Sequence, residues 1–250
     1  MQVHILFLLP MAFLLLPGTW SGEIIGGKEA KPHSRPYMAY LEIQFGEETF
    51  RCGGFLVAKN FVLTAAHCQG DTITAVLGAH SLEKRREQQK IKVSKKIPHE
   101  KYNNRTKKND FMLLQLAKPA KLNKFVNTIP LPKTGETVEP GMVCSVAGWG
   151  LTIANDISSA ANALREVDVE VLEDDECSYG DNYDPATMLC VGHPQKCRDS
   201  AKGDSGGPLV CDGKPQGIVS WGTKDGTPPG VYTRVSTFIR WIQDKMRRPQ

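Results

Sequence analysis

Apolar and polar residues alternate over short segments through most of the chain. The clearest case is residues 166–171, where three valines alternate with three acidic residues, so an extended chain places all valines on one face. Comparable apolar runs occupy residues 37–43, 61–64, 72–77, 111–116, 143–147 and 217–221. Glycine and proline separate these runs. Many short strands joined by turns predict an all-β sandwich or barrel.

A helical periodicity marks the C-terminal end. After Ser236, which we expect to cap the helix, apolar residues are spaced to form one stripe: Phe238, Trp241, Ile242 and Met246. Basic residues follow where they suit the helix dipole: Lys245, Arg247 and Arg248. The pattern predicts a single helix that packs one face against the β-structure.

Residues 1–21 differ from the rest because they contain apolar runs and no charged side chain. Pro10 and Pro17 interrupt the runs, and the small residues Thr19 and Ser21 stand where a signal peptidase cuts. The alternative, a membrane anchor, is disfavoured because the unbroken apolar stretch is too short to span a bilayer. We therefore predict a signal peptide and a secreted protein, with no membrane insertion.

Charge adds a weak indication about partners. The formal net charge is +4, and removal of residues 1–23 deletes one acidic residue, Glu23, which brings it to about +5. A basic surface favours sulfated polysaccharide without requiring it. We expect no nucleic acid among the partners.

The seven cysteines all follow residue 51, and a secreted chain normally oxidises them to disulfides. The odd count leaves at least one thiol without an intrachain partner, and spacing alone does not fix the pairing. A zinc site at Cys190, His193 and Cys197 has suitable ligand types. An oxidising compartment competes for those sulfurs, so we expect no metal and no cofactor.

Three segments carry residues of the types that take part in nucleophilic catalysis. His67 ends the apolar segment 63–68, Asp110 opens the apolar segment 109–116, and Ser205 lies among glycines in segment 203–209. Each has an ordinary interpretation alone: a structural histidine, a capping or turn aspartate, and a glycine-rich turn. Glycines around one serine also permit a backbone that exposes the hydroxyl and directs N–H groups to one point.

Together, in the order His, Asp, Ser, these segments resemble the chymotrypsin-like serine proteases. The resemblance extends from Ile24 to the final helix and implies two six-stranded antiparallel β-barrels with a catalytic triad between them. It implies that Ser205 attacks the peptide carbonyl, that His67 transfers the proton, and that Asp110 orients the imidazole. It also implies an oxyanion hole formed by the backbone N–H groups of Gly203 and Ser205.

The resemblance implies an activation mechanism as well. Residues 22–27 resemble the family's activation site, at which cleavage after Glu23 frees the ammonium group of Ile24 to pair with Asp204. A buried carboxylate is costly when unpaired, whereas an ammonium partner fixes the loop that carries it. We therefore expect three segments: signal peptide 1–21, activation dipeptide 22–23 and protease domain 24–250.

The short activation segment and residues 31–39 look like the granzyme, mast-cell chymase and cathepsin G branch of the family. That branch implies storage in the secretory granules of immune cells, activation by a dipeptidyl peptidase, serpin-type inhibitors and sulfated proteoglycans as partners. The resemblance also pairs Cys52 with Cys68, Cys144 with Cys211, and Cys177 with Cys190. Cys197 then has no partner.

Substrate preference is predicted from the position six residues before Ser205. In the family this residue, here Asp199, lies at the base of the primary specificity pocket, and Gly222 and Gly230 would line its walls. A carboxylate at the end of an open pocket selects Arg or Lys through charge-assisted hydrogen bonds. Chymotryptic or dual specificity is the alternative, because many members of the branch lack this acid.

Surface features add further expectations. Asn104 begins an N-glycosylation sequon, and Lys107 and Lys108 would favour acidic residues before the cut, or be ordinary solvated side chains. Basic residues cluster at positions 84–86 and 90–96, which favours either proteoglycan binding or a solvated edge. A different class, an inert cationic homologue, is disfavoured because the triad residues are all retained.

Overall fold

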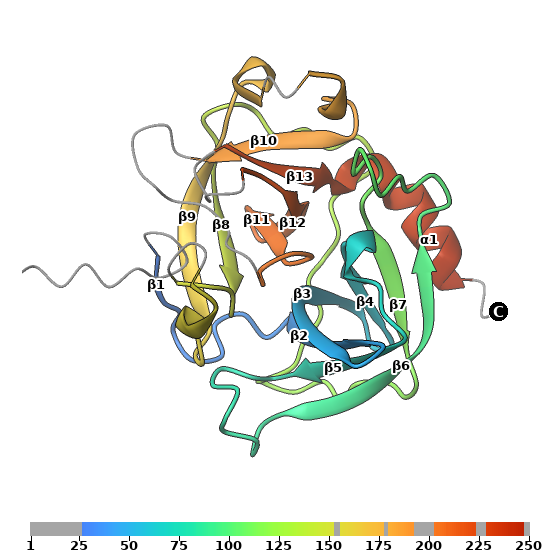
Figure 1. Ribbon diagram of the computed structural model, residues 1–250, viewed down its shortest axis with the longest axis vertical. Helices are drawn as coiled ribbons and strands as arrows, with labels where there is room; N and C mark the ends of the chain where they lie inside the picture. Colours follow the sequence, from blue (N-terminus) through green and yellow to red (C-terminus); the bar gives the residue numbers. More distant parts are fainter. Residues whose placement is uncertain (1–26, 153–155, 178–179, 193–202, 224–228, 248–250) are drawn as a thin grey trace, which may run out of the picture.

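The computed structural model describes residues 27–152, 156–177, 180–192, 203–223 and 229–247. The predicted signal peptide and activation dipeptide lie outside these ranges. Two β-barrels are packed together, and helix α1 (Ile239–Arg247) lies at the C-terminal end of the chain (Figure 1). The prediction of two six-stranded antiparallel barrels with one C-terminal helix is confirmed.

The first barrel closes in the strand order β2-β3-β4-β7-β6-β5 (Figure 1). All its pairs are antiparallel. Its strands are β2 (Met38–Phe45), β3 (Glu48–Ala58), β4 (Phe61–Thr64), β5 (Thr72–Leu77), β6 (Gln89–Pro98) and β7 (Met112–Leu116). Buried residues such as Leu41, Phe55 and Leu63 form its core.

The second barrel has the order β9-β10-β13-β12-β11-β8 and closes because β8 also pairs with β9. The two-residue strand β1 (Lys28–Glu29) pairs with β9 outside the closed ring. The six strands are β8 (Val143–Gly148), β9 (Arg165–Val171), β10 (Met188–Gly192), β11 (Pro208–Cys211), β12 (Lys214–Trp221) and β13 (Gly230–Arg234).

Strand β9 shows how the sequence pattern produces this barrel. Val167, Val169 and Val171 are buried in its core, while the acidic residues between them face outward. Full burial of each valine contributes about 1.5–3 kcal/mol relative to exposure. Strand β10 was missed by the pattern because all five of its residues are buried, which removes the alternation that marks a half-buried strand.

The expected start of the C-terminal helix is wrong. A 3₁₀ turn, η5 (Val235–Phe238), precedes α1, so Ser236 lies inside that turn and is only 3% exposed. The helix N-cap is therefore not Ser236. The apolar stripe is correct, because Phe238 and Ile242 are buried against the first barrel and Trp241 packs beside them. Helix α1 thus joins the two halves: it follows β13 of the second barrel and packs on the first.

Among the described residues, further 3₁₀ turns connect the strands: η1 (Ala66–Cys68), η2 (Ile157–Ser159), η3 (Asp174–Cys177) and η4 (Gly180–Asn182). Three disulfides join Cys52 to Cys68, Cys144 to Cys211 and Cys177 to Cys190. These are the pairs that the family resemblance implied. Cys190 is therefore not available as a zinc ligand, while His193 and Cys197 lie outside the described residues. No described helix is long and apolar enough to cross a membrane.

Candidate active site

His67 is held at the end of β4 by a buried carboxylate. It lies in η1, and its ring Nδ1 is 2.7 Å from Oδ2 of Asp110, while its backbone N–H donates to Oδ1 of the same residue at 2.9 Å. A carboxylate only accepts, so the proton of the neutral imidazole is on Nδ1 and Nε2 carries the lone pair. Nε2 is thus the ring atom that can take a proton from another group.

Asp110 precedes β7 and is 0% exposed. A buried carboxylate without donors would be strongly destabilising, and this one has a third donor: Ser220 Oγ in β12 donates to Oδ2 at 2.6 Å. Thr233 Oγ1 in β13 donates to the Asp110 carbonyl at 2.9 Å. Two strands of the second barrel therefore fix an aspartate that belongs to the first.

Ser205 enters the same region from the second barrel. Its carbonyl oxygen accepts a hydrogen bond from the N–H of Gly53 in β3 at 2.8 Å and lies 3.7 Å from the Cys68 sulfur. The turn is closed by Gly207 N–H, which donates to the Asp204 carbonyl at 2.9 Å, and by Gly206 N–H, which donates to Val219 at 2.9 Å. The loop that carries Ser205 is therefore fixed against both barrels.

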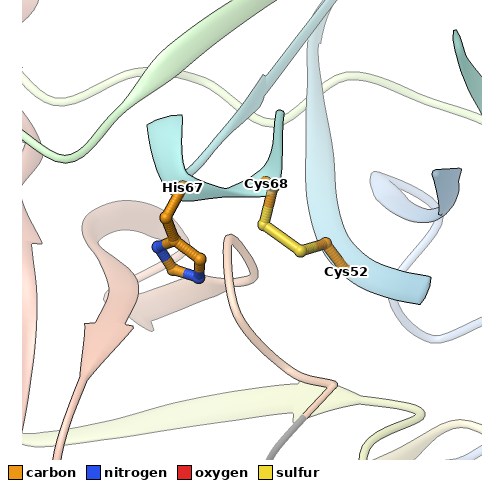
Figure 2. A group of neighbouring side chains, drawn as sticks. All are labelled: Cys52, His67 and Cys68. Atoms are coloured by element: carbon orange, nitrogen blue, oxygen red, sulfur yellow. A yellow bond between two sulfur atoms is a disulfide. The ribbon is translucent and has the colours of Figure 1, made fainter. Parts of the chain in front are cut away.

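The short helix η1 places His67 next to a disulfide. Figure 2 shows the imidazole ring of His67 near the Cys52–Cys68 disulfide. The side chains of His67 and Cys68 leave neighbouring positions of η1. Donor atoms of Cys52, His67 and Cys68 lie within 4.8 Å of one another. The two sulfurs are bonded to each other, so they are not thiolates and this group is not a metal site.

Two glycines permit the backbone conformation of the loop that carries Ser205. Gly203 has φ +105°, and a Cβ there would lie 3.0 Å from the Gly150 Cα. Gly206 has φ +81°, and a Cβ there would lie 2.1 Å from Thr64 Oγ1. Only glycine combines this backbone region with so little space.

Asp204 is wholly buried beside Ser205. The N–H of Gly150 donates to its Oδ1 at 2.8 Å. Added Cβ atoms on Gly148 and Gly150 would lie 2.0 and 2.5 Å from its carboxylate oxygens. Two glycines of the β8 region thus make space for this carboxylate. Ile24, its predicted ammonium partner, lies outside the described residues.

The predicted specificity pocket is described only in part. Gly222 is exposed just after β12, and Gly230 is buried at the start of β13. The two strands pair, so these glycines flank the same edge of the second barrel. Asp199, the predicted base of the pocket, lies outside the described residues.

The predicted glycosylation residue lies on an ordered loop before Asp110. Asn104 is exposed, and its side-chain oxygen accepts hydrogen bonds from Tyr102 Oη at 3.0 Å and Lys107 Nζ at 2.7 Å. Burial, together with the charge of Asp110, raises the pKa of Tyr102, so its hydroxyl stays protonated as the donor. Lys107 is thus held by its own loop.

The start of this loop is attached to helix α1. The Glu100 carboxylate pairs with Lys245 Nζ at 2.5 Å and accepts from Trp241 Nε1 at 2.6 Å. The hydrogen bond from Lys245 lowers the pKa of Glu100 to about 2. The N–H of His99 donates to the Phe111 carbonyl at 3.1 Å, next to Asp110. The helix therefore orients the chain that positions Asp110.

Sequence reasoning missed several residues of this site. Ser220 and Thr233 are hydroxyl residues within largely buried strands, and nothing in the local sequence distinguishes them from other strand residues. Glu100 and Lys245 are ordinary charged residues far apart in the chain. Only Gly148 and Gly150, as turn glycines flanking Trp149, gave a signal that a close backbone approach occurs there.

Two antiparallel β-barrels that bring a histidine–aspartate pair and a glycine-bounded serine loop together at their junction define a chymotrypsin-like serine protease. Comparisons with known proteins agree. The model of the trypsin family matches residues 24–242. The chain is 53% identical to sheep mast cell protease 3 over 98% of this chain and 97% of that protein.

Two further relatives also match the chain over nearly its whole length. Human granzyme H is 52% identical, over 97% of this chain and 98% of that protein, and human cathepsin G is 49% identical, over 96% and 94%. A solved structure described as "Structure of GrC" has a TM-score of 0.85 and 44% identity, and covers 89% of this chain and 99% of that one.

The chain therefore belongs to the trypsin family. It is a chymotrypsin-like serine protease of the granzyme and cathepsin G type, a hydrolase whose substrates are peptides and proteins.

Proposed function

We propose that the protein is a serine endopeptidase in which His67, Asp110 and Ser205 form the catalytic triad. The observation that carries the proposal is the 2.7 Å contact between His67 Nδ1 and the wholly buried Asp110 carboxylate, which leaves Nε2 as a base. Nε2 removes the Ser205 hydroxyl proton as Oγ attacks the substrate carbonyl. It then returns the proton to the leaving amine, which leaves the acyl group on Ser205. Water, deprotonated by the same Nε2, then attacks this acyl group, releases the acid and restores the Ser205 hydroxyl.

Charge on the attacked oxygen is stabilised by the backbone N–H groups of Gly203 and Ser205. The positive φ of Gly203 supports this role, because it turns the preceding peptide into an orientation that other residues avoid. Loss of one such donor typically costs about 2.7–4 kcal/mol of transition-state stabilisation. Asp110 stabilises the imidazolium that forms during each step.

Activation follows from the same loop. Residues 1–21 act as a signal peptide, and a dipeptidyl peptidase removes Gly22-Glu23 to leave the protease domain 24–250. The Ile24 ammonium group then pairs with Asp204 and fixes the loop that carries the oxyanion donors. The burial of Asp204 supports this pairing, since a buried carboxylate requires a compensating cation or donors.

Substrates are cleaved after Arg or Lys, because Asp199 supplies a carboxylate at the base of a pocket bounded by Gly222 and Gly230. Asp199→Ser should lower kcat/KM for arginyl peptides far more than for phenylalanyl peptides. An unchanged arginine preference in this variant would exclude Asp199 as the determinant. Chymotryptic or dual specificity would then stand in its place.

The cellular setting follows from the branch. We propose storage in secretory granules of immune cells, inhibition by serpin-type inhibitors, and glycosylation at the exposed Asn104. Lys90 and Lys92 are exposed on one face of β6, as alternation predicts, which supports contact with sulfated proteoglycan. Retention on immobilised heparin should then fall steeply with salt.

A covalent probe tests the proposed catalytic residues. Recombinant protein that begins at Ile24 should be labelled by a fluorophosphonate at Ser205, which peptide mapping identifies. Ser205→Ala should abolish both labelling and peptide hydrolysis, whereas Ser158→Ala, in η2, should retain both. An unlabelled but folded protein would instead support an inert cationic homologue.

A further inference from the structure

A histidine outside the proposed triad joins the N-terminal segment to the first barrel. His80 lies in the loop between β5 and β6, and its ring Nε2 is 2.9 Å from Oε1 of Glu29 in β1. Glu29 is five residues after Ile24, whose ammonium group is proposed to pair with Asp204. A side chain of the first barrel therefore holds the chain close to the group that is proposed to activate the enzyme.

The imidazole ring of His80 is oriented for this contact. The side chain is 13% exposed, and its other ring nitrogen, Nδ1, is buried with no hydrogen-bond partner in the described part of the chain. Such nitrogens are rare, because burial removes their hydrogen bonds to water. A carboxylate only accepts, so Nε2 carries the proton of the neutral ring and Nδ1 carries the lone pair. The contact with Glu29 therefore accounts for the orientation of the ring.

The backbone of the same residue contacts the surroundings of Asp204. The His80 carbonyl accepts a hydrogen bond from Trp149 Nε1 at 3.0 Å. Trp149 is 1% exposed and stands between Gly148 and Gly150, the two glycines that leave space for the Asp204 carboxylate. His80 thus connects the N-terminal segment, through its ring, with the neighbourhood of the buried carboxylate, through its backbone.

Strand β1 is also fixed by the second barrel. Both of its residues pair with β9, and the N–H of Ala30 donates to the Leu164 carbonyl at 2.9 Å. The N–H of Leu164 in turn donates to the His80 carbonyl at 2.8 Å. Ile24 is four residues before β1, which limits the distance of its ammonium group from β1 to about 14 Å. A fixed β1 therefore restricts the volume in which this group can move.

Other charged groups near His80 have partners of their own. His33, whose φ is +58°, has its ring centroid 6.2 Å from that of His80 and its Nε2 3.9 Å from Oε2 of Glu87. Glu83 accepts a hydrogen bond from the Asn162 side chain at 3.0 Å. Both carboxylates of the loop between β5 and β6 are therefore engaged by groups other than the His80 ring.

We propose that His80 is a positioning residue for activation: through Glu29 it holds the segment that directs the Ile24 ammonium group to Asp204. This inference rests on the proposed activation of the enzyme and adds a residue of the first barrel to it. Anchoring of β1 keeps the ammonium group at a high effective concentration near the carboxylate. Loss of the anchor increases the fraction of protein in which the two groups are apart.

The alkaline limit of activity measures this positioning. Pairing with a buried carboxylate raises the pKa of an α-amino group above its ordinary value. Protein that begins at Ile24 should therefore lose kcat/KM as pH rises through the raised pKa, because the neutral amine no longer pairs with Asp204. A tenfold loss of preference for the paired state moves the midpoint of this decline down by about one pH unit.

Two variants remove the contact from either side. Glu29→Ala and His80→Leu should each lower the midpoint of the alkaline decline by about 0.3–0.7 pH units, since a partly exposed histidine–carboxylate contact contributes modestly. Near pH 7 kcat/KM should change by less than about twofold, because the paired state still predominates there. Glu29 is 56% exposed, so its replacement leaves the packing of the core intact. A general loss of stability would not produce this combination.

Further variants separate the contact from other effects. His80→Gln, whose amide can donate to Glu29, should keep the midpoint near that of the unmodified protein. The double variant Glu29→Ala/His80→Leu should shift the midpoint no further than either single change, because both remove one contact. Glu83→Ala is the matched control: it removes a carboxylate of the same loop that binds Asn162, and it should leave the midpoint unchanged.

Each contrary outcome has a distinct meaning. An unchanged midpoint in both Glu29→Ala and His80→Leu would overturn the inference. Equal shifts in Glu29→Ala and Glu83→Ala would also overturn it and indicate a general effect of surface charge. Protein that begins at Gly22 tests the underlying activation, because it lacks the Ile24 ammonium group. If this protein is equally active and declines at the same pH, the proposed activation itself fails.

Discussion

Gly206 lies where a side chain would collide with the first barrel. A Cβ at this position would be 2.1 Å from Thr64 Oγ1 and 2.6 Å from the Gly53 carbonyl oxygen. These two groups form a hydrogen bond with each other, in which Thr64 Oγ1 donates to Gly53 O at 2.8 Å. The residue after Ser205 therefore limits how closely the two barrels approach at the proposed active site.

Gly206→Ala should damage both stability and activity, and Gly213→Ala provides the matched control. Both glycines have positive φ, +81° and +73°, but nothing lies within 4 Å of a Cβ on Gly213. Gly213→Ala should cost about 1–2 kcal/mol in urea unfolding and retain labelling of Ser205. Gly206→Ala should cost clearly more and lose labelling, because the clash displaces the loop. Equal costs would show that the barrels separate freely here.

The chemically distinctive residues were predictable at this scale, and their supports were not. His67, Asp110 and Ser205 stand in short sequence motifs. These motifs are specific for the chymotrypsin-like serine proteases when all three occur in this order. Ser220 and Thr233 hydrogen-bond to Asp110, yet a hydroxyl in a strand is common, and only the pairing of β12 with β13 brings both near it. Contacts between distant strands leave no trace in local sequence.

Helix α1 and the loop that begins at His99 act as one element. Glu100 joins Lys245 and Trp241 of the helix, and the His99 ring packs against Phe111, Phe238 and Trp241 at centroid distances of 4.9–5.3 Å. Burial among these rings lowers the pKa of His99, which favours its neutral form. The helix thus stabilises the segment that leads to Asp110.

The Glu100 contact should produce a defined pH dependence. Its pKa is lowered from 4.5 to about 2 in the fold, so its contribution to stability is complete above pH 4.5 and is lost as pH falls toward 2. Its side chain is 57% exposed, which limits the contribution to about 0.5–1 kcal/mol. Glu100→Gln should lower the free energy of unfolding by this amount at pH 7.

Unfolding measured at several pH values checks this sign. The difference between Glu100→Gln and the unmodified protein should shrink steadily below pH 4.5. Glu47→Gln, in the turn between β2 and β3, removes an exposed carboxylate and should change stability little at any pH. A Glu100→Gln difference that persists unchanged near pH 3 would mean that the ion pair with Lys245 is not its source.

Elements with clear periodicity were predicted well. Strands β4 and β5 have the residue limits that the pattern indicates, and β9 begins one residue earlier. The helix stripe was correct but its first turn was not, because the chain enters α1 through a buried 3₁₀ turn that Ser236 does not cap. Periodicity identifies which face is buried, whereas the entry geometry depends on the barrel that the turn packs against.

At the scale of the whole molecule, the proposed active site lies where the two barrels meet. His67 and Asp110 come from the first barrel, and Ser205, Ser220 and Thr233 come from the second. The loop with Ser205 also carries Asp204, whose carboxylate is buried beside Gly148 and Gly150 of the second barrel. A change at Asp204 is therefore transmitted directly to the backbone N–H groups of Gly203 and Ser205.

This arrangement predicts that the N-terminus controls activity. Protein that begins at Ile24 should hydrolyse peptides with a kcat/KM about 10²–10³-fold higher than protein that begins at Gly22, because only the former has an ammonium group placed to pair with Asp204 and complete the oxyanion hole. Active-site titration and kcat/KM measured on both proteins check this. Asp204→Asn should reduce the Ile24 protein to the lower level and change the Gly22 protein little, while Asp212→Asn, in an exposed turn, should affect neither. Equal activity of the two proteins would show that the loop is formed without the Ile24 ammonium group.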